Sequence, residues 1–249
     1  MNLSGQAALV TGGTKGIGAA TATALAKEGA NVAIVGRHLD NDAKSTCDAI
    51  RALGRRCEVI QADCSQASEA TRCVRETEAR LGAVDVLVHS AGGPVNGGLF
   101  ELTPELWHAA FDVHVHAIFH LCRAAMPAMR AKKEGAIILI SSTAGIRGVI
   151  TNIAYQVAKG AVPQFARALA REFANDNIRV NCVAPGVVRT AFHAAMTEEQ
   201  RRLNLEQRIP LHREGTPAPV AELIVTLVKN DYITGETMTI DGGLTMRIA

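Results

Sequence analysis

Short apolar runs alternate with longer helical patterns along almost the whole chain, and this alternation restricts the possible folds more than any other feature. The apolar runs predict strands at Ala7–Thr11, Asn31–Val35, Cys57–Gln61, Asp85–His89, Ala136–Ser141, Arg179–Ala184 and Thr237–Asp241. Helical patterns lie between them, at Ile17–Glu28, Asn41–Leu53, Ser68–Leu81, Pro104–Ala131, Ile153–Asn175 and Pro217–Lys229. Strict alternation predicts an α/β fold: one doubly wound parallel sheet of about seven strands with helices on both faces.

The length of the chain is compatible with one domain. It has 249 residues, and α/β folds of this size commonly form a single unit, so we expect one domain over residues 1–249. The longest stretch without regular periodicity runs from Pro185 to about Thr216, directly after a predicted strand. Because such folds bind ligands at the carboxyl ends of their strands, residues 187–216 are expected to form a substrate loop.

The composition argues against several classes of partner. The formal net charge is +2 and the basic residues are scattered, so no nucleic-acid partner is expected. No apolar stretch is long enough to span a bilayer and the first residues lack a leader pattern, so we expect a cytoplasmic protein with no membrane partner. The six cysteines lack metal-ligand spacing; we expect them to be reduced and buried, and no metal site is predicted.

A glycine-rich turn connects the first predicted strand to the first predicted helix. In Thr11–Gly18, the residues Gly12, Gly16 and Gly18 permit a tight turn and close approach of the backbone to a diphosphate at the helix N-terminus. The spacing is Gly-x-x-x-Gly-x-Gly rather than the Gly-x-Gly-x-x-Gly of the common dinucleotide fingerprint. The turn could also be a plain strand-to-helix connection, but its place in the β-α pattern favours nucleotide binding.

The charge at the end of the second predicted strand indicates which nicotinamide cofactor is used. No Asp or Glu stands there to accept hydrogen bonds from a free ribose 2′-hydroxyl; Arg37 stands there instead, and Lys15 adds a second cation from the glycine turn. Two cations near one place suit a 2′-phosphate, although they could also be ordinary surface charges. We therefore predict NADP(H) in preference to NAD(H).

Tyr155 and Lys159 form the pair that points to chemistry. Their spacing of four places both side chains on one face of a helix, about one turn apart. An ammonium close to a phenol favours the phenolate, so we expect the pKa of Tyr155 to fall towards neutral pH. Such a tyrosine suits proton exchange with an alcohol or carbonyl oxygen. The pair alone is weak support, because the same spacing occurs by chance in many helices.

Taken together, these residues resemble the short-chain dehydrogenase/reductase family over nearly the whole chain, and within it the 3-oxoacyl-carrier-protein reductases. The segments that carry the resemblance are Thr11–Gly18, Asp63, Ala91-Gly92, Ser142 with Tyr155 and Lys159, Asn181 with Pro185-Gly186 and Thr190, and Tyr232–Gly235 with Asp241–Gly243. The resemblance implies a Rossmann-type fold. The cofactor-binding residues that it implies are Gly12, Thr14, Lys15, Gly16, Ile17, Gly18, Arg37, Asp63, Cys64, Ser90, Ala91, Gly92, Tyr155, Lys159, Pro185, Gly186, Val188 and Thr190.

The resemblance also implies catalytic roles. Tyr155 would exchange a proton with the substrate oxygen, and Ser142 would bind and orient that oxygen. Lys159 would lower the pKa of Tyr155 and hold the nicotinamide ribose. Ser141 is an equally available neighbour, and Ser142 is preferred for its position thirteen residues before Tyr155. Pro163, four residues after Lys159, cannot donate to the Lys159 carbonyl, so a local bend in the helix is expected.

The chain departs from the family pattern at two places. His114 stands where relatives have the asparagine that completes a catalytic tetrad. Histidine titrates near neutral pH, so His114 could support a proton relay; equally, it could be a packing residue with no part in proton transfer. His89-Ser90 replaces a pair of asparagines before Ala91-Gly92, which removes amide contacts there.

Two functions from different classes remain open at this point. The first is an NADP(H)-dependent oxidoreductase that interconverts a secondary alcohol and a ketone, acting on a small molecule through Ser142, Tyr155, Lys159 and His114. The second is a catalytically silent nucleotide-binding protein that senses the cofactor or helps assembly. A carrier-protein substrate would require a basic docking patch, to which Arg130, Lys132 and Lys133 could contribute, although these residues could also be a solvated helix end.

The quaternary structure follows from two helical patterns. Residues Leu106–Met126 and Val157–Phe173 carry more apolar residues than one sheet-facing stripe requires, including Phe119 and Phe165. In the family that the chain resembles, these helices commonly form a subunit interface. A homotetramer is therefore expected, with a dimer as the alternative.

Overall fold

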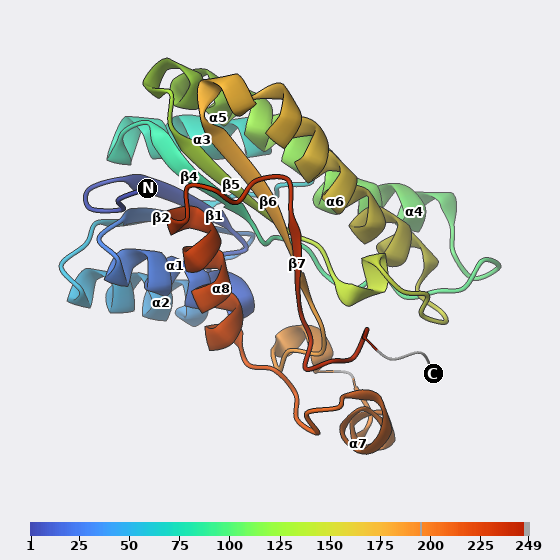
Figure 1. Cartoon of the computed structure of the whole chain (residues 1–249). Helices are drawn as coiled ribbons and strands as arrows, with labels where there is room; N and C mark the ends of the chain where they lie inside the picture. Colours follow the sequence, from blue (N-terminus) through green and yellow to red (C-terminus); the bar gives the residue numbers. More distant parts are fainter. Residues whose placement is uncertain (195, 247–249) are drawn as a thin grey trace.

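Seven parallel strands form a single sheet in the order β3-β2-β1-β4-β5-β6-β7 (Figure 1). The computed structural model describes residues 1–194 and 196–246. The strands are β1 (Ala7–Thr11), β2 (Asn31–Gly36), β3 (Cys57–Gln61), β4 (Val84–His89), β5 (Gly135–Ile140), β6 (Ile178–Pro185) and β7 (Thr237–Ile240). The winding reverses between the neighbouring strands β1 and β4, which creates the switch point where open α/β sheets bind ligands. This confirms the doubly wound parallel sheet expected from the sequence.

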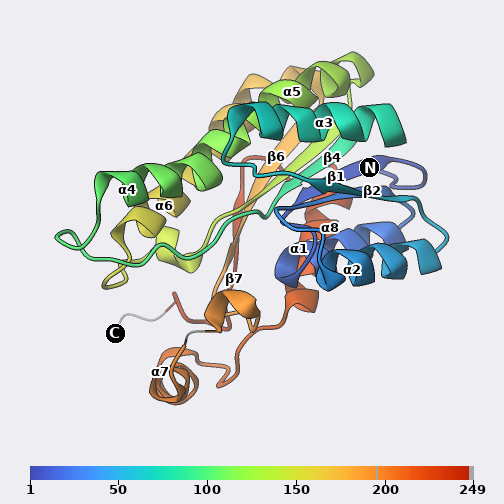
Figure 2. The same ribbon diagram turned by 180° about the vertical axis from the view of Figure 1, so that it is seen from behind.

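Helices cover both faces of the sheet (Figures 1 and 2). One face carries α1 (Gly16–Lys27), α2 (Asn41–Ala52) and α8 (Pro217–Lys229), and the other carries α3 (Ala67–Leu81), α5 (Ala117–Lys132) and α6 (Ile153–Glu172). In β1, Leu9 packs into the core beneath the second helix layer and Val10 into the core beneath the first. Because both faces of the sheet are covered, the side chains that point to either face are apolar, which explains the continuous apolar runs in the sequence.

The predicted helix from Pro104 to Ala131 is interrupted. The structure has α4 (Pro104–Phe111), a π turn (η1, Asp112–His116) and then α5. The Ala117 amide donates to the Asp112 carbonyl, one residue further back than in an α-helix. The prediction of one uniform helix is therefore wrong at this point. Single π turns inside α-helices frequently mark functional sites, and this one carries His114.

The segment after β6 contains regular structure that periodicity did not reveal. It holds two single turns, η4 (Ala191–His193) and η5 (Asn204–Arg208), and the short helix α7 (Glu198–Leu203), which lies apart from the sheet (Figure 1). Thr197 and Gln200 form a reciprocal capping box at the start of α7. Six residues are too few to show a helical period, so the expectation of an irregular segment was wrong here.

The expectation for the cysteines is confirmed, since all six are free and buried. The residues that the structure describes contain no group of three or more potential metal ligands. Within residues 1–194 and 196–246, no helix is both long and apolar enough to cross a membrane.

Candidate active site

The carboxyl ends of β1, β4 and β6 bring most of the predicted cofactor-binding residues together. A Cβ atom placed on Gly12 would lie 2.8 Å from both the Ser90 carbonyl oxygen and the Ala91 amide nitrogen, so the glycine turn lies directly against the end of β4. A Cβ on Gly16 would lie 3.3 Å from the Thr190 methyl group. Residues far apart in the sequence therefore enclose one place at the switch point.

The start of α1 has the properties of a diphosphate site. Lys15 is the N-cap, but no side chain caps the helix and its first turn holds no acidic residue, so its amide groups face outward without a side-chain partner. Gly18 packs so closely on the turn that a Cβ there would lie 2.1 Å from the Gly12 carbonyl oxygen. Backbone donors and the positive helix end suit a dinucleotide diphosphate, so the turn, including Thr14 and Ile17, fits that group.

The two predicted cations are not equivalent. The Lys15 ammonium lies 3.6 Å from the Asp40 carboxylate and 3.8 Å from that of Asp42. Arg37 is exposed just after β2 and forms no ion pair with the residues that the structure describes. Lys15 is therefore shared with two carboxylates, and Arg37 is the more available partner for a phosphate.

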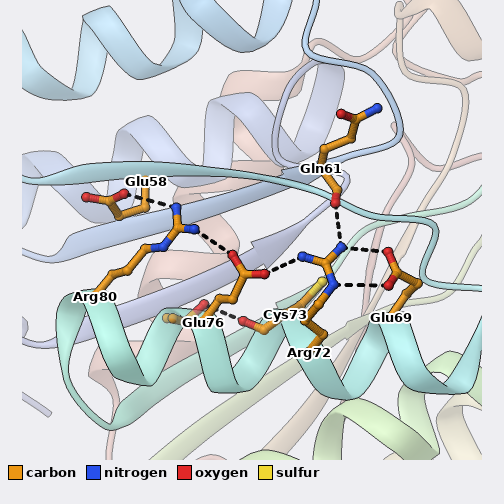
Figure 3. Close-up of polar contacts among 8 residues, drawn as sticks. Glu58, Gln61, Glu69, Arg72, Cys73, Glu76 and Arg80 are labelled. Carbon is orange, nitrogen blue, oxygen red and sulfur yellow. Dashed lines mark hydrogen bonds and ion pairs between the residues drawn. The ribbon is translucent and has the colours of Figure 1, made fainter.

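Gln61, at the end of β3, links the Arg37 segment to the neighbouring helix α3, and Figure 3 shows its contact with Arg72. Its side-chain amide donates to the Arg37 carbonyl at 3.1 Å, and its own carbonyl accepts from the Arg72 guanidinium at 2.7 Å. Arg72 also pairs with Glu69 and Glu76 on α3. Each exposed ion pair contributes little alone, but the network fixes β3, and with it the backbone that carries Arg37.

Asp63 and Cys64 follow β3 at the same edge of the sheet. The Asp63 carboxylate accepts a hydrogen bond from the Ser65 amide at 3.0 Å. Cys64 is buried, and its thiol shares a hydrogen bond with the thiol of Cys73 on α3. The side chain of Cys64 is thus directed into the core, and any contact with a cofactor must come from its backbone.

The remaining predicted cofactor residues follow β6. Pro185 is the last residue of the strand, and a Cβ on Gly186 would lie 2.7 Å from the Asp241 side chain after β7. Val188 forms an isolated parallel bridge with Gly215 and is buried. The backbone before Thr190 is therefore held by contacts with Asp241 and Gly215.

Tyr155 and Ser142 meet at the carboxyl end of β5. Tyr155 lies in the first turn of α6 and is 8 % exposed, and Ser142 lies two residues after the end of β5 in extended conformation. Burial raises the pKa of Tyr155 to about 12, because a phenolate would lose its hydration, while a hydrogen bond with Ser142 lowers it. The predicted fall in the pKa of Tyr155 is therefore wrong in direction for this structure.

Lys159 is buried one turn after Tyr155. Its ammonium donates to the Ile140 carbonyl at 2.7 Å and lies 5.7 Å from the centre of the Tyr155 ring. Burial lowers the pKa of Lys159 to about 8, against a smaller opposing effect of the Cys182 thiol. A proton can therefore leave Lys159 far more readily than from an exposed lysine.

The two adjacent serines have different partners. The Ser142 hydroxyl accepts from the Ala144 amide at 3.1 Å and remains beside Tyr155. The Ser141 hydroxyl donates to the Lys159 carbonyl at 2.7 Å and is buried. This arrangement favours Ser142 as the residue that contacts the substrate.

The helix α6 continues through Pro163.

His114 packs directly against Tyr155. The two ring centres lie 5.3 Å apart in an edge-to-face arrangement, and His114 Nε2 lies 3.1 Å from the Gly93 carbonyl oxygen. Because a carbonyl only accepts, Nε2 carries the proton, and Nδ1 has no hydrogen-bond partner among the residues that the structure describes. A Cβ on Gly92 would lie 2.1 Å from the His114 ring, so glycine is required there.

The environment keeps His114 neutral. Burial lowers its pKa to about 2, and the nearby Lys159 charge acts in the same direction. Of the two roles that the sequence left open for His114, the low pKa favours an uncharged packing and hydrogen-bonding residue over a group that is protonated during turnover.

His89 connects β4 to the π turn. Its Nε2 atom lies 3.0 Å from the Val113 carbonyl oxygen, and its Nδ1 atom lies 2.9 Å from the Thr11 hydroxyl. The Thr11 oxygen accepts in turn from the Ala91 amide at 3.3 Å. Burial lowers the pKa of His89 to about 4. Both histidines are thus connected to the π turn: His89 contacts its backbone at Val113, and His114 is part of it.

Phe192 is a site residue that the sequence analysis did not single out. Its ring centre lies 5.7 Å from that of Tyr155, at an interplanar angle of 49°. It belongs to η4, two residues after Thr190. The position of an aromatic residue just after the nicotinamide-side motif was the one signal in the sequence that could have indicated it.

Comparisons with known proteins agree with this geometry. The family model described as enoyl-(acyl carrier protein) reductase matches residues 12–245. The 3-oxoacyl-[acyl-carrier-protein] reductase of Escherichia coli is 35 % identical over 248 residues, which cover 99 % of this chain and all of that protein. The enzyme of the same name from Synechocystis is 36 % identical and covers 98 % of each chain.

Solved structures show the same relationship. A blue fluorescent protein from a metagenomic library, crystallised with NADPH, superposes with a TM-score of 0.91 at 32 % identity, covering 98 % of this chain and all of that one. A double mutant of a short-chain dehydrogenase/reductase from Serratia marcescens gives 0.92 at 31 % identity with the same coverage. With its switch-point site and its near full-length relatives, the chain belongs to the short-chain dehydrogenase/reductase family of oxidoreductases.

Proposed function

We propose that the protein is an NADP(H)-dependent oxidoreductase that interconverts a secondary alcohol and a ketone. The observation that carries the proposal is the meeting of Ser142, Tyr155 and Lys159 beside the glycine turn. Tyr155 is the proton donor and acceptor, and Ser142 binds the same substrate oxygen. When bound, a nicotinamide supplies or accepts the hydride, and the protein supplies position and charge.

The protonation states favour ketone reduction. With a pKa of about 12, Tyr155 carries its proton at neutral pH and can donate it to a carbonyl oxygen that gains negative charge. The Lys159 ammonium, 5.7 Å from the ring, stabilises the phenolate that remains. Lys159 then returns a proton to Tyr155, which its pKa of about 8 makes easier.

The cofactor is NADP(H), held by the glycine turn and Arg37. The exposed Arg37 guanidinium suits a 2′-phosphate, and the crystallised relative with NADPH is consistent with this choice. The substrate enters beside residues 187–216. Ile146 and Val149, which follow the turn after Ser142, and Phe192 of η4 are exposed apolar side chains, which favours a neutral, partly apolar ketone.

A carrier-protein substrate has weaker support. Arg130 and Lys133 both pair with Asp176, and Lys132 pairs with Asp85. These basic residues are engaged with carboxylates of this chain, which reduces their value as a docking patch. A small-molecule substrate therefore remains the proposal.

The protein is proposed to be a homotetramer, with a dimer as the alternative. An apolar groove runs between the outer faces of α5 and α6 and includes Phe119, Phe165 and Phe173. Phe119 is 47 % exposed, which suits burial by a second copy. Light scattering at micromolar concentration tests this; a monomer mass would contradict it. A cytoplasmic location stays a prediction from the sequence.

The function is tested with a panel of ketones and NADPH, followed by the loss of NADPH absorbance. The Tyr155→Phe variant removes only the hydroxyl, and we expect turnover to fall roughly 10²- to 10⁴-fold. The matched control is Tyr232→Phe, because Tyr232 is the other tyrosine of the chain and is 96 % exposed. Tight NADPH binding without turnover of any ketone would instead support the silent nucleotide-binding protein.

A further inference from the structure

We propose that Phe192 limits the size of the smaller substituent on the ketone, as a wall that fixes the substrate against Tyr155. The inference rests on the proposed ketone reduction and adds a specificity-determining residue to it. Phe192 reaches the site from the segment after β6, whereas Ser142, Tyr155 and Lys159 come from β5 and α6. It is the aromatic side chain of that segment in ring contact with Tyr155.

Three different neighbours surround the Tyr155 ring. His114 presents its edge at 5.3 Å from the π turn, and the Lys159 ammonium lies 5.7 Å from the ring centre. Phe192 contributes the third contact at 5.7 Å. His114 and Lys159 are buried at 1 % and 5 % exposure, whereas Phe192 is 37 % exposed. Of these three neighbours only Phe192 is substantially exposed to solvent, so we place the ketone on the Phe192 side of Tyr155.

The backbone around Phe192 is held in place. The following residue, His193, places its Nδ1 atom 2.9 Å from the Val188 carbonyl oxygen, and its ring packs edge-on against Phe192 with centres 5.0 Å apart. The His193 amide also donates to the Thr190 carbonyl at 3.1 Å. Phe192 is consequently presented by a closed turn, which gives its ring a defined position.

Two ion pairs fix the base of the same segment. The Arg189 guanidinium lies 2.9 Å from the buried Glu214 carboxylate, and Arg201 of α7 lies 3.5 Å from the other oxygen of that group. The Arg189 amide also donates to the Gly215 carbonyl at 2.9 Å. These contacts join Arg189 to Glu214 and Gly215, so the two ends of the segment that carries Phe192 are held together.

A fixed aromatic wall discriminates by size. A ketone bound through its oxygen to Tyr155 and Ser142 directs two substituents away from that oxygen, and one of them meets Phe192. One methylene too many against a rigid apolar wall changes kcat/KM by roughly 10- to 200-fold. The protein should therefore prefer ketones in which one substituent is a methyl group.

The experiment uses 2-octanone, 3-octanone and 4-octanone with NADPH and the full-length protein. These isomers have the same composition; the smaller substituent grows from methyl to ethyl to propyl while the larger one shortens from hexyl to pentyl to butyl. We expect kcat/KM to fall at least tenfold from 2-octanone to 4-octanone. In Phe192→Ala the ratio of kcat/KM for 4-octanone to that for 2-octanone should rise towards one. The kcat/KM for 4-octanone should increase, and kcat for 2-octanone should fall because this substrate is no longer held in one orientation.

Two further variants separate a wall from a general structural role. Phe192→Tyr keeps an aromatic ring and should leave the ratio of kcat/KM for 4-octanone to that for 2-octanone as it is in the original protein. Leu53→Ala removes a side chain of similar exposure, 38 %, at the far end of α2 and should leave the ratio unchanged. If Phe192→Ala lowers kcat/KM for all three ketones by one common factor, Phe192 has only a structural role and the inference is overturned.

A measurement without turnover tests the contact itself. In the Tyr232→Phe background, Tyr155 is the single tyrosine, so carbon-13 labelled tyrosine gives one set of ring signals. Adding Phe192→Ala should move these signals, since the Phe192 ring current is lost, whereas adding Leu53→Ala should not. Unmoved signals overturn the inference. If the signals do not move but turnover still depends on Tyr155, only the role of Phe192 is rejected. If turnover survives Tyr155→Phe, the proposed function itself is rejected.

Discussion

The Ser141 hydroxyl donates a hydrogen bond of 2.7 Å to the carbonyl oxygen of Lys159. In a regular helix this carbonyl would accept from the amide four residues later, but that residue is Pro163, which has no amide proton. Ser141 therefore supplies from β5 the donor that α6 lacks. It thereby anchors the turn of α6 that carries Tyr155 and Lys159.

This relationship predicts a coupling between Ser141 and Pro163. Ser141→Ala leaves the buried carbonyl without a donor and should reduce the free energy of unfolding by about 1–3 kcal/mol. In a Pro163→Ala background the restored amide can satisfy the carbonyl, so the same substitution should cost less. Urea unfolding of the four proteins of this double-mutant cycle gives the coupling energy. Equal costs in both backgrounds would contradict it, and Ser142→Ala, which should mainly lower kcat, is the control.

The burial of Lys159 predicts a pH-dependent difference in stability. Its folded pKa of about 8 lies below the reference value of 10.5, so between these values the unfolded chain binds more protons and stability rises with pH. Lys159→Met removes the free-energy cost of burying a charged ammonium. Its melting temperature should exceed that of the original protein most below pH 8, and the gap should narrow as the pH approaches 10.5, while turnover is lost. A gap that is constant with pH would show that Lys159 titrates normally.

The two buried histidines predict a loss of stability in acid. The folded pKa values of about 4 for His89 and about 2 for His114 lie below the reference of 6.5, so the unfolded chain takes up protons first as the pH falls. Each histidine should cost on the order of 2 kcal/mol by about pH 4.5. His89→Asn and His114→Asn should each flatten the fall of melting temperature between pH 6.5 and 4. Exchange of the exposed His38 for Asn should not change that slope.

The unequal cations at the end of β2 predict different effects on cofactor choice. Arg37→Ala should lower kcat/KM for NADPH about tenfold or more while NADH is little affected, because a charge-assisted contact to the 2′-phosphate is lost. Lys15→Ala should have a smaller effect, since Lys15 is shared with Asp40 and Asp42. Steady-state kinetics with both cofactors gives the ratio. A larger loss for Lys15→Ala than for Arg37→Ala would reverse the assignment.

The sequence was informative wherever a short pattern is tied to one backbone arrangement. Apolar runs buried on both sides indicated the strands, and the glycine turn after β1 indicated the proposed diphosphate site. The spacing of Tyr155 and Lys159 gave one face of α6, since a helix carries residues four apart on the same side. These relationships are local, so they could be predicted without knowing how the layers pack.

The electrostatics required the tertiary structure. The sequence predicted that the pKa of Tyr155 falls towards neutral pH, but burial raises it to about 12 in the folded protein. An ordinary histidine titrates near neutral pH, but burial lowers the pKa of His114 to about 2. A pKa depends on the depth of burial and on every neighbouring charge, which come from segments far apart in the chain. No spacing of two residues contains that information.

By itself the sequence determined the parallel sheet and the position of the glycine turn, and it indicated Ser142, Tyr155 and Lys159 as the candidate catalytic residues. Only the tertiary structure decided that the Ser141 hydroxyl replaces the amide donor that Pro163 lacks, and that His114 and Phe192 both contact the Tyr155 ring. The physical reason is that periodicity and turn chemistry act between residues close in sequence. Burial, ring contacts and hydrogen-bond partners depend on which distant segments the packed core brings together.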